Sequence, residues 1–79
     1  MLVKTRQYRE QKTLNKIGRR IKQLRQEQNL TQKELAFKCD FEVKQVQRIE
    51  YAEVNCSVSH IAAIAKAFKL TLSEFFDMD

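Results

Sequence analysis

The side chains with the most informative chemistry lie between residues 42 and 51. On a helix that turns by about 100° per residue, the side opposite Val46 and Ile49 carries nitrogen donors and no carboxylate. The outward residues are Lys44, Gln47, Arg48 and Tyr51, with Val43 and Gln45 at the flanks. Lys and Arg match the O6 and N7 acceptors of guanine, Gln matches the adenine edge, and a Val methyl matches the thymine methyl. This face therefore suits base-pair edges in the major groove of DNA.

A second polar group precedes this segment. Thr31 and Glu34 have the spacing of a capping box, in which a hydroxyl and a carboxylate satisfy free amides at a helix start. Gln32 and Lys33 follow the cap, where free backbone amides and the positive end of the helix dipole favour a phosphate. We therefore predict that Thr31, Gln32 and Lys33, together with Tyr51, contact the DNA backbone while the following segment reads bases.

Helices must hold these residues in place. The chain has no proline and one glycine, and it is rich in strong helix formers such as Ala, Leu, Lys, Gln, Glu and Arg. Apolar spacing and capping residues predict an all-α fold with five helices around one core. We expect the helices at residues 13–28, 32–39, 42–51, 58–68 and 72–76, with Ser57 and Thr71 as caps of the last two. The fourth helix should bury Val58, Ile61, Ile64, Ala65 and Phe68. Residues 1–12 are predicted to form a basic N-terminal extension of a single domain at residues 13–79.

Composition and charge limit the possible classes of protein. The chain has 79 residues, a mean hydropathy of −0.55 and no apolar run long enough to span a membrane. No secretory signal is recognisable, so we expect a cytoplasmic protein without a membrane partner. Residues 1–25 hold nine Lys or Arg and one acid, whereas residues 26–79 hold six bases and nine acids. This asymmetry favours a polyanionic partner.

Groups for catalysis or metal binding are scarce. His60, Cys39 and Cys56 are one ligand short of a closed zinc site, and a cytosolic location argues against a disulfide. There is no glycine-rich phosphate loop, and no nucleophile is placed beside a base. We therefore expect no metal, no cofactor and no enzymatic activity.

Three strings between Ile17 and Phe76 form a specific composite pattern. They are Ile21-Lys22-Gln23-Leu24-Arg25, Leu30-Thr31-Gln32-Lys33-Glu34-Leu35-Ala36 and Arg48-Ile49-Glu50. Through these strings the sequence resembles the phage-repressor-like (Xre/Cro type) helix-turn-helix family. The resemblance implies a transcription regulator that binds operator DNA. It also implies that Gln32 holds a phosphate and orients a base-reading side chain, and that Arg25 and Glu50 form a salt bridge between the first and third helices. The base-reading residues would be Val43, Lys44, Gln47 and Arg48.

The chain departs from this family at the helix ends. Where the family usually has glycine, this chain has Asn29, Asp40, Ala52 and Lys69. A non-glycine residue in the left-handed conformation costs roughly 1 kcal/mol. We therefore expect lower stability or slightly different turns.

The sequence does not decide between two kinds of transcription regulator and one alternative function. The length resembles that of the stand-alone controller proteins of restriction-modification systems, and equally that of small prophage repressors. The alternative is an antitoxin-like module that binds a protein partner and its own operator. One recognition helix covers few base pairs, so we expect a homodimer on double-stranded DNA. Its interface is predicted at Leu72, Phe76 and Met78, with Phe75 in the core.

Overall fold

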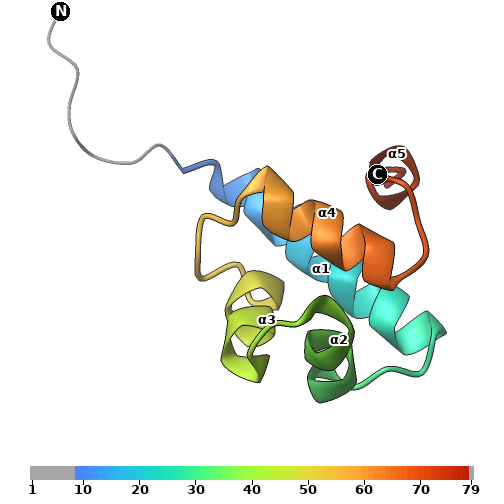
Figure 1. The fold of residues 1–79 in the computed structure, drawn as a ribbon. Coiled ribbons are helices and arrows are strands. Elements are labelled where there is room, and N and C mark those ends of the chain that lie inside the picture. The colour runs from blue at the N-terminus through green and yellow to red at the C-terminus, as the bar shows by residue number, and fades with distance from the viewer. Residues whose placement is uncertain (1–8, 79) are drawn as a thin grey trace, which may run out of the picture.

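The computed structural model describes residues 9–78, and every regular element within them is a helix (Figure 1). The helices are α1 (Gln11–Glu27), α2 (Gln32–Cys39), α3 (Val43–Glu50), α4 (Val58–Ala67) and α5 (Leu72–Phe75). The prediction of an all-α fold with five helices is confirmed. Residues 1–8 of the predicted extension lie outside the described part of the chain, and the domain boundary after residue 12 stays a prediction.

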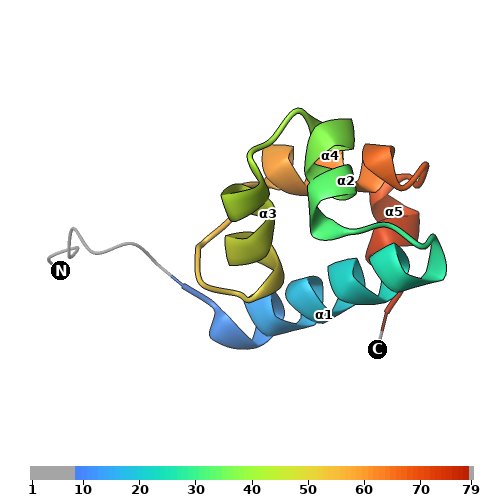
Figure 2. The same ribbon diagram turned by 90° about the horizontal axis from the view of Figure 1, so that it is seen from below.

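The long helix α1 packs chiefly against α3. Figures 1 and 2 both show α2 and α3 side by side, with α3 against α1. Helix α2 also packs against α4, and α4 against α5. The pair formed by α2 and α3 is therefore held from two sides, by α1 and by α4.

One hydrophobic core joins all five helices. Its largest fully buried side chains are Ile21, Leu35, Val46, Ile64, Phe68 and Phe75. One expected member is wrong, because Val58 is 73% exposed. Val58 has the apolar spacing of the buried residues of α4, but it lies in the first turn, where the neighbouring residues are exposed and no other helix of the described chain covers the side chain.

Capping boxes fix where α2, α4 and α5 begin. In α2, the Thr31 hydroxyl accepts a hydrogen bond from the Glu34 amide at 3.0 Å, and the Glu34 carboxylate accepts one from the Thr31 amide at 2.8 Å. The bond from the Thr31 backbone lowers the pKa of Glu34. Thr71 and Glu74 repeat the arrangement in α5. These local pairs explain why the starts of α2 and α5 match the predictions.

Between residues 9 and 78, four residues that are not glycine adopt the left-handed backbone conformation. They are Asn29, Asp40, Ala52 and Lys69, with φ values of 55°, 58°, 59° and 64°. These are the positions at which the resembling family usually has glycine. The chain therefore keeps the turn geometry and accepts a strain of roughly 1 kcal/mol at each position.

Helix α1 begins two residues earlier than expected, at Gln11 instead of Thr13. The reason is a contact with a distant segment, because Arg9 and Gln11 both donate to the Ala52 carbonyl, at 2.8 and 3.1 Å. The side chain of the N-cap residue, Glu10, makes no capping hydrogen bond, and the chain just after α3 anchors the first turn of α1 instead.

Three further long-range hydrogen bonds, from two side chains of the α1 segment, satisfy carbonyls near the ends of α4 and α5. Arg20 donates to the carbonyls of Phe75 and Glu74, both at 2.8 Å. Gln28 donates to the carbonyl of Phe68 at 3.1 Å. Carbonyls at a helix end lack partners within the helix, so these side chains tie α4 and α5 to α1.

Candidate nucleic-acid interface

Helices α2 and α3 form the two-helix unit expected from the sequence. They are joined by Asp40, Phe41 and Glu42, and the left-handed Asp40 lets the chain reverse within this short turn. Glu42 and Tyr51 flank α3 as its caps, so the helix is one residue shorter at each end than predicted. Val46 and Ile49 are buried, which fixes the rotation of α3 about its axis.

The outward face of α3 carries the predicted cations. Lys44 and Arg48 are exposed, and Tyr51 is 59% exposed at the end of the helix. Gln47 and Val43 lie half-buried at the edges, and Val43 packs partly against the core. Glu50 is the one acid within α3, and it is buried. The exposed part of this helix is therefore positively charged.

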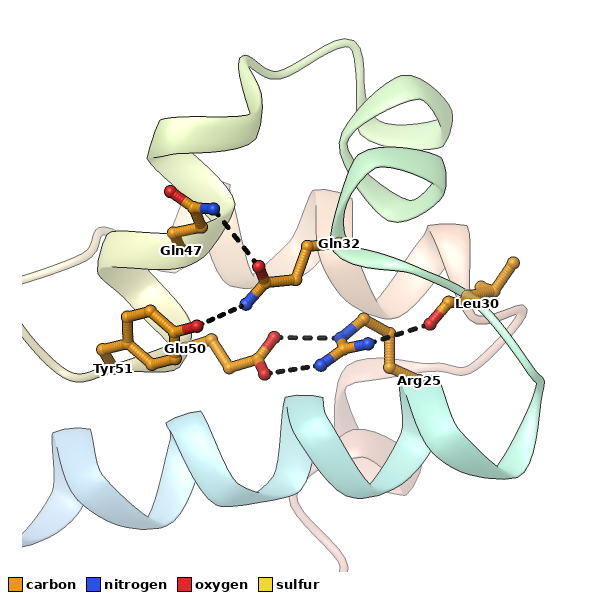
Figure 3. Close-up of polar contacts among 6 residues, drawn as sticks. All are labelled: Arg25, Leu30, Gln32, Gln47, Glu50 and Tyr51. Carbon is orange, nitrogen blue, oxygen red and sulfur yellow. Dashed lines mark hydrogen bonds and ion pairs between the residues drawn. The ribbon is translucent and has the colours of Figure 1, made fainter.

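A chain of side-chain hydrogen bonds links α2 to this face (Figure 3). The Gln47 amide nitrogen donates to the Gln32 oxygen at 3.3 Å, and the Gln32 nitrogen donates to the Tyr51 hydroxyl at 3.3 Å. Gln32 is the first residue of α2, so its position is set by the Thr31 cap. The structure thus brings together three of the predicted contact residues, Gln32, Gln47 and Tyr51, and their mutual hydrogen bonds set the orientation of each side chain.

Arg25 and Glu50 lie next to this chain and connect α1 with α3. Figure 3 shows two parallel bonds, from Arg25 Nε to Glu50 Oε2 at 3.0 Å and from Nη2 to Oε1 at 2.7 Å. Arg25 Nη1 also donates to the carbonyl of Leu30 at 2.9 Å. The Glu50 side chain is 2% exposed and that of Arg25 15%. The hydrogen bond with Glu50 raises the pKa of Arg25, against the opposing effect of burial.

The remaining predicted phosphate contacts lie at the start of α2. Lys33 is exposed there, in the first turn of the helix. The oxygen of the Thr31 hydroxyl accepts the capping bond, which leaves its hydrogen as a donor. One exposed cation of α1, Lys22, lines an open groove together with Gln32 and Tyr51 and so extends the positive surface.

The sequence did not indicate how the other edge of α3 is held. The Gln45 side chain contacts His60 of α4, with 3.2 Å between Gln45 Nε2 and His60 Nε2. His60 also closes the capping box of α4 with Ser57, in the place usually taken by Glu or Gln. The spacing of Ser57 and His60 was the one available signal, but the contact with Gln45 depends on packing between helices.

The C-terminal residues predicted to form an interface are only partly covered. Leu72 is 38% exposed and Phe76 is 43% exposed, whereas Phe75 is fully buried. The Phe76 ring meets the Phe75 ring edge to face, with 5.2 Å between centroids. Met78 is half-buried and packs against the core.

His60, Cys39 and Cys56 are the residues that the sequence offered as candidate metal ligands. Within residues 9–78 no cluster of three His, Cys, Asp or Glu side chains is arranged to hold a metal ion. Burial raises the pKa of both Cys39 and Cys56, which disfavours the reactive thiolate. In the same part of the chain no helix is long and apolar enough to cross a membrane.

Comparisons with known proteins agree with this geometry. A profile of the helix-turn-helix family matches residues 21–75. The restriction-modification controller protein C.AhdI from Aeromonas hydrophila has 31% sequence identity and a TM-score of 0.78, over 82% of this chain and 98% of its own. The restriction-modification controller protein C.Esp1396I has 29% identity and a TM-score of 0.81, over 87% of this chain and 90% of its own.

A longer protein shares the domain. The apo form of ComR from S. Thermophilus has 31% identity and a TM-score of 0.72, over 81% of this chain but only 22% of its own. A comparison with curated protein sequences finds no match. Because the matched residues cover most of the chain and contain both α2 and α3, the chain belongs to the Xre-like helix-turn-helix family of DNA-binding transcription regulators.

Proposed function

We propose that this protein is a sequence-specific regulator of transcription that places α3 in the major groove of operator DNA. The exposed, acid-free face of α3 around Lys44 and Arg48 carries the proposal. Gln47 lies at its edge with an orientation set by Gln32, and held donors and acceptors are what base reading requires. Lys33 and Tyr51 flank the face, where the phosphates of the groove would run.

The similarity to two restriction-modification controller proteins supports a narrower proposal. This chain covers nearly the whole length of both proteins at about 30% identity. We infer that the regulated genes are those of a restriction-modification system. The proposal requires a methyltransferase and an endonuclease gene close to the gene of this protein, and a different set of neighbouring genes would contradict it.

Arg48→Ala should weaken binding to a preferred DNA site by about 1 to 3 kcal/mol and relax the base preference at one position. Lys33→Ala should instead weaken binding to all sequences alike, because a phosphate contact carries no sequence information. The measurement is competition between a duplex selected from random DNA and an unrelated duplex of equal length. Equal losses on both duplexes for Arg48→Ala would remove this residue from base reading.

The dependence on salt checks whether DNA is the ligand at all. Lys and Arg side chains that neutralise phosphates release condensed counterions, so the logarithm of the binding constant should fall linearly with the logarithm of salt concentration. A nearly flat dependence would contradict the proposed function.

We further propose that the protein binds DNA as a homodimer through α5. Two-fold pairing would let two copies of α3 enter the groove about 34 Å apart. Leu72 and Phe76 are both partly exposed and lie four residues apart, so they share one side of the last turn and offer apolar surface for such pairing, with the half-buried Met78 two residues further on. A buried Phe75 completes the core of the monomer, which leaves the Phe76 ring for a partner.

Phe76→Asp should give a folded monomer with weakened operator binding, because a carboxylate would be buried without a partner in the dimer. Sedimentation gives the mass, and a thermal melt shows whether the fold is kept. Phe37→Asp is the matched control, since Phe37 on α2 is 87% exposed and the same substitution there should leave the dimer intact. Loss of the fold would place Phe76 in the core, and an unchanged dimer would exclude this interface.

A further inference from the structure

The two glutamines at the edges of α3 are held in the same manner. Gln47 contacts Gln32 in the first turn of α2, and Gln45 contacts His60 in the first turn of α4. Lys44 and Arg48 lie between them on the exposed face. Each edge of the outward face therefore has one amide whose orientation is set by a neighbouring helix.

His60 is itself fixed on three sides. Its Nδ1 atom accepts a hydrogen bond from the Ser57 amide at 3.5 Å, and its own amide donates to the Ser57 hydroxyl at 3.1 Å. The imidazole ring meets the Phe41 ring edge to face, with 5.5 Å between centroids. Together with the Gln45 contact, these bonds define both the place and the rotation of the ring.

The capping bond decides which nitrogen of His60 carries the proton. A neutral imidazole has one donor and one acceptor nitrogen. Because Nδ1 accepts from Ser57, Nε2 must be the donor. A donor at His60 Nε2 needs an acceptor, so the Gln45 amide turns its oxygen towards Nε2 and its NH₂ group away from it. This assignment exchanges the O and N atoms of the Gln45 amide without moving either atomic position.

Gln45 borders the proposed DNA-binding face. Gln45 and His60 line an open groove of about 380 Å³ beside α3, together with the two cations Lys44 and Arg48 and one acid, Glu42. Both outward cations of α3 thus border the same groove as the Gln45 amide. A base edge that entered this groove would lie next to Gln45 as well as to the two cations.

We propose that Gln45 reads guanine, and that His60 is the positioning residue that makes Gln45 a donor. Guanine is the one base that presents two acceptors, O6 and N7, in the major groove. Adenine pairs its N7 acceptor with an amino donor, cytosine presents an amino donor, and thymine presents the single acceptor O4 beside a methyl group. The Gln47 amide is oriented the other way round. One of its N–H groups donates to Gln32, which leaves its oxygen as the available acceptor. The inference rests on the proposed function, since it assigns one further contact in the same interface.

Three variants test the inference on a duplex that the wild-type protein selects from random DNA. Gln45→Ala identifies the base pair that Gln45 reads, by lowering the preference for guanine there at least about fivefold. His60→Gln should keep that preference, because glutamine also offers one acceptor and one donor. His60→Glu should lose it, because a carboxylate offers only acceptors and would turn the Gln45 NH₂ group inwards.

Glutamine and glutamate both close a capping box, so a purely structural role for His60 would not separate these two variants. Ser59→Glu places the same charge on an exposed neighbour and controls for repulsion from DNA. Equal base preferences for His60→Glu and His60→Gln would overturn the inference, as would a Gln45→Ala protein with unchanged preferences. A wild-type protein that selects no sequence would instead remove the proposed function, and this inference with it.

The protonation state of His60 gives a readout that is independent of the variants. Imidazole ¹⁵N chemical shifts at pH 8 should place the proton on Nε2. A proton on Nδ1 would contradict the proposed orientation of Gln45, whatever the variants do.

Discussion

Arg25→Met should lower the free energy of unfolding by about 3 to 5 kcal/mol, because it leaves the Glu50 carboxylate buried without a partner. Glu50 is 2% exposed and both of its oxygens accept bonds from Arg25. The Leu30 carbonyl loses its donor in the same variant. Since small domains are stable by only about 5 to 15 kcal/mol, the loss would remove a large part of the total.

The double variant Arg25→Met, Glu50→Leu should recover much of this loss. Two apolar side chains need no partner, and replacing a buried ion pair with apolar groups is often neutral or stabilising. Urea unfolding of the wild type, both single variants and the double variant gives the coupling energy between the two sites. Additive effects would show that the pair contributes no coupling, since residues in contact normally deviate from additivity by 0.5 to 3 kcal/mol.

The elements that could be predicted from the sequence are those whose signals are local. Thr31 and Glu34 lie three residues apart, so their capping box fixes the start of α2 without any knowledge of the fold. The left-handed residues Asn29 and Asp40 follow from the same kind of short pattern at helix ends. The rotation of α3 also follows, because the spacing of its apolar residues defines the buried side.

The contacts that sequence reasoning missed join segments far apart in the chain. Arg9 reaches the Ala52 carbonyl, and Arg20 reaches α5. Each is an ordinary exposed Arg when only its neighbours in sequence are considered. The pairing of Gln45 with His60 was missed for the same reason, since it depends on how α3 and α4 pack. Helix spacing gives the direction of a side chain but not the element that it meets.

The role of the single glycine, Gly18, also depends on a contact between distant segments and could not be predicted from the sequence. Gly18 lies in the middle of α1, where glycine is unfavourable by roughly 1 kcal/mol relative to alanine. The structure explains its presence, because α3 crosses α1 at this residue. A Cβ atom at position 18 would lie 2.2 Å from the Glu50 carbonyl oxygen and 3.0 Å from its carbonyl carbon. Both atoms belong to the backbone, so no change of rotamer can relieve the clash.

Gly18→Ala should therefore destabilise the protein by about 2 kcal/mol or more, although the substitution improves helix propensity. Overpacking of a well-packed contact costs about 1 to 3 kcal/mol where side chains can adjust, and here α3 itself would have to move. That movement would displace Glu50 from Arg25 and tilt the outward face of α3, so operator affinity should fall as well. Urea unfolding measures the first effect and competition binding the second.

Gln26→Ala is the matched control, because Gln26 is exposed on the same helix and its replacement alters little besides helix propensity. If Gly18→Ala instead stabilised the protein by the roughly 1 kcal/mol that propensity alone gives, the close approach of α1 and α3 would be wrong.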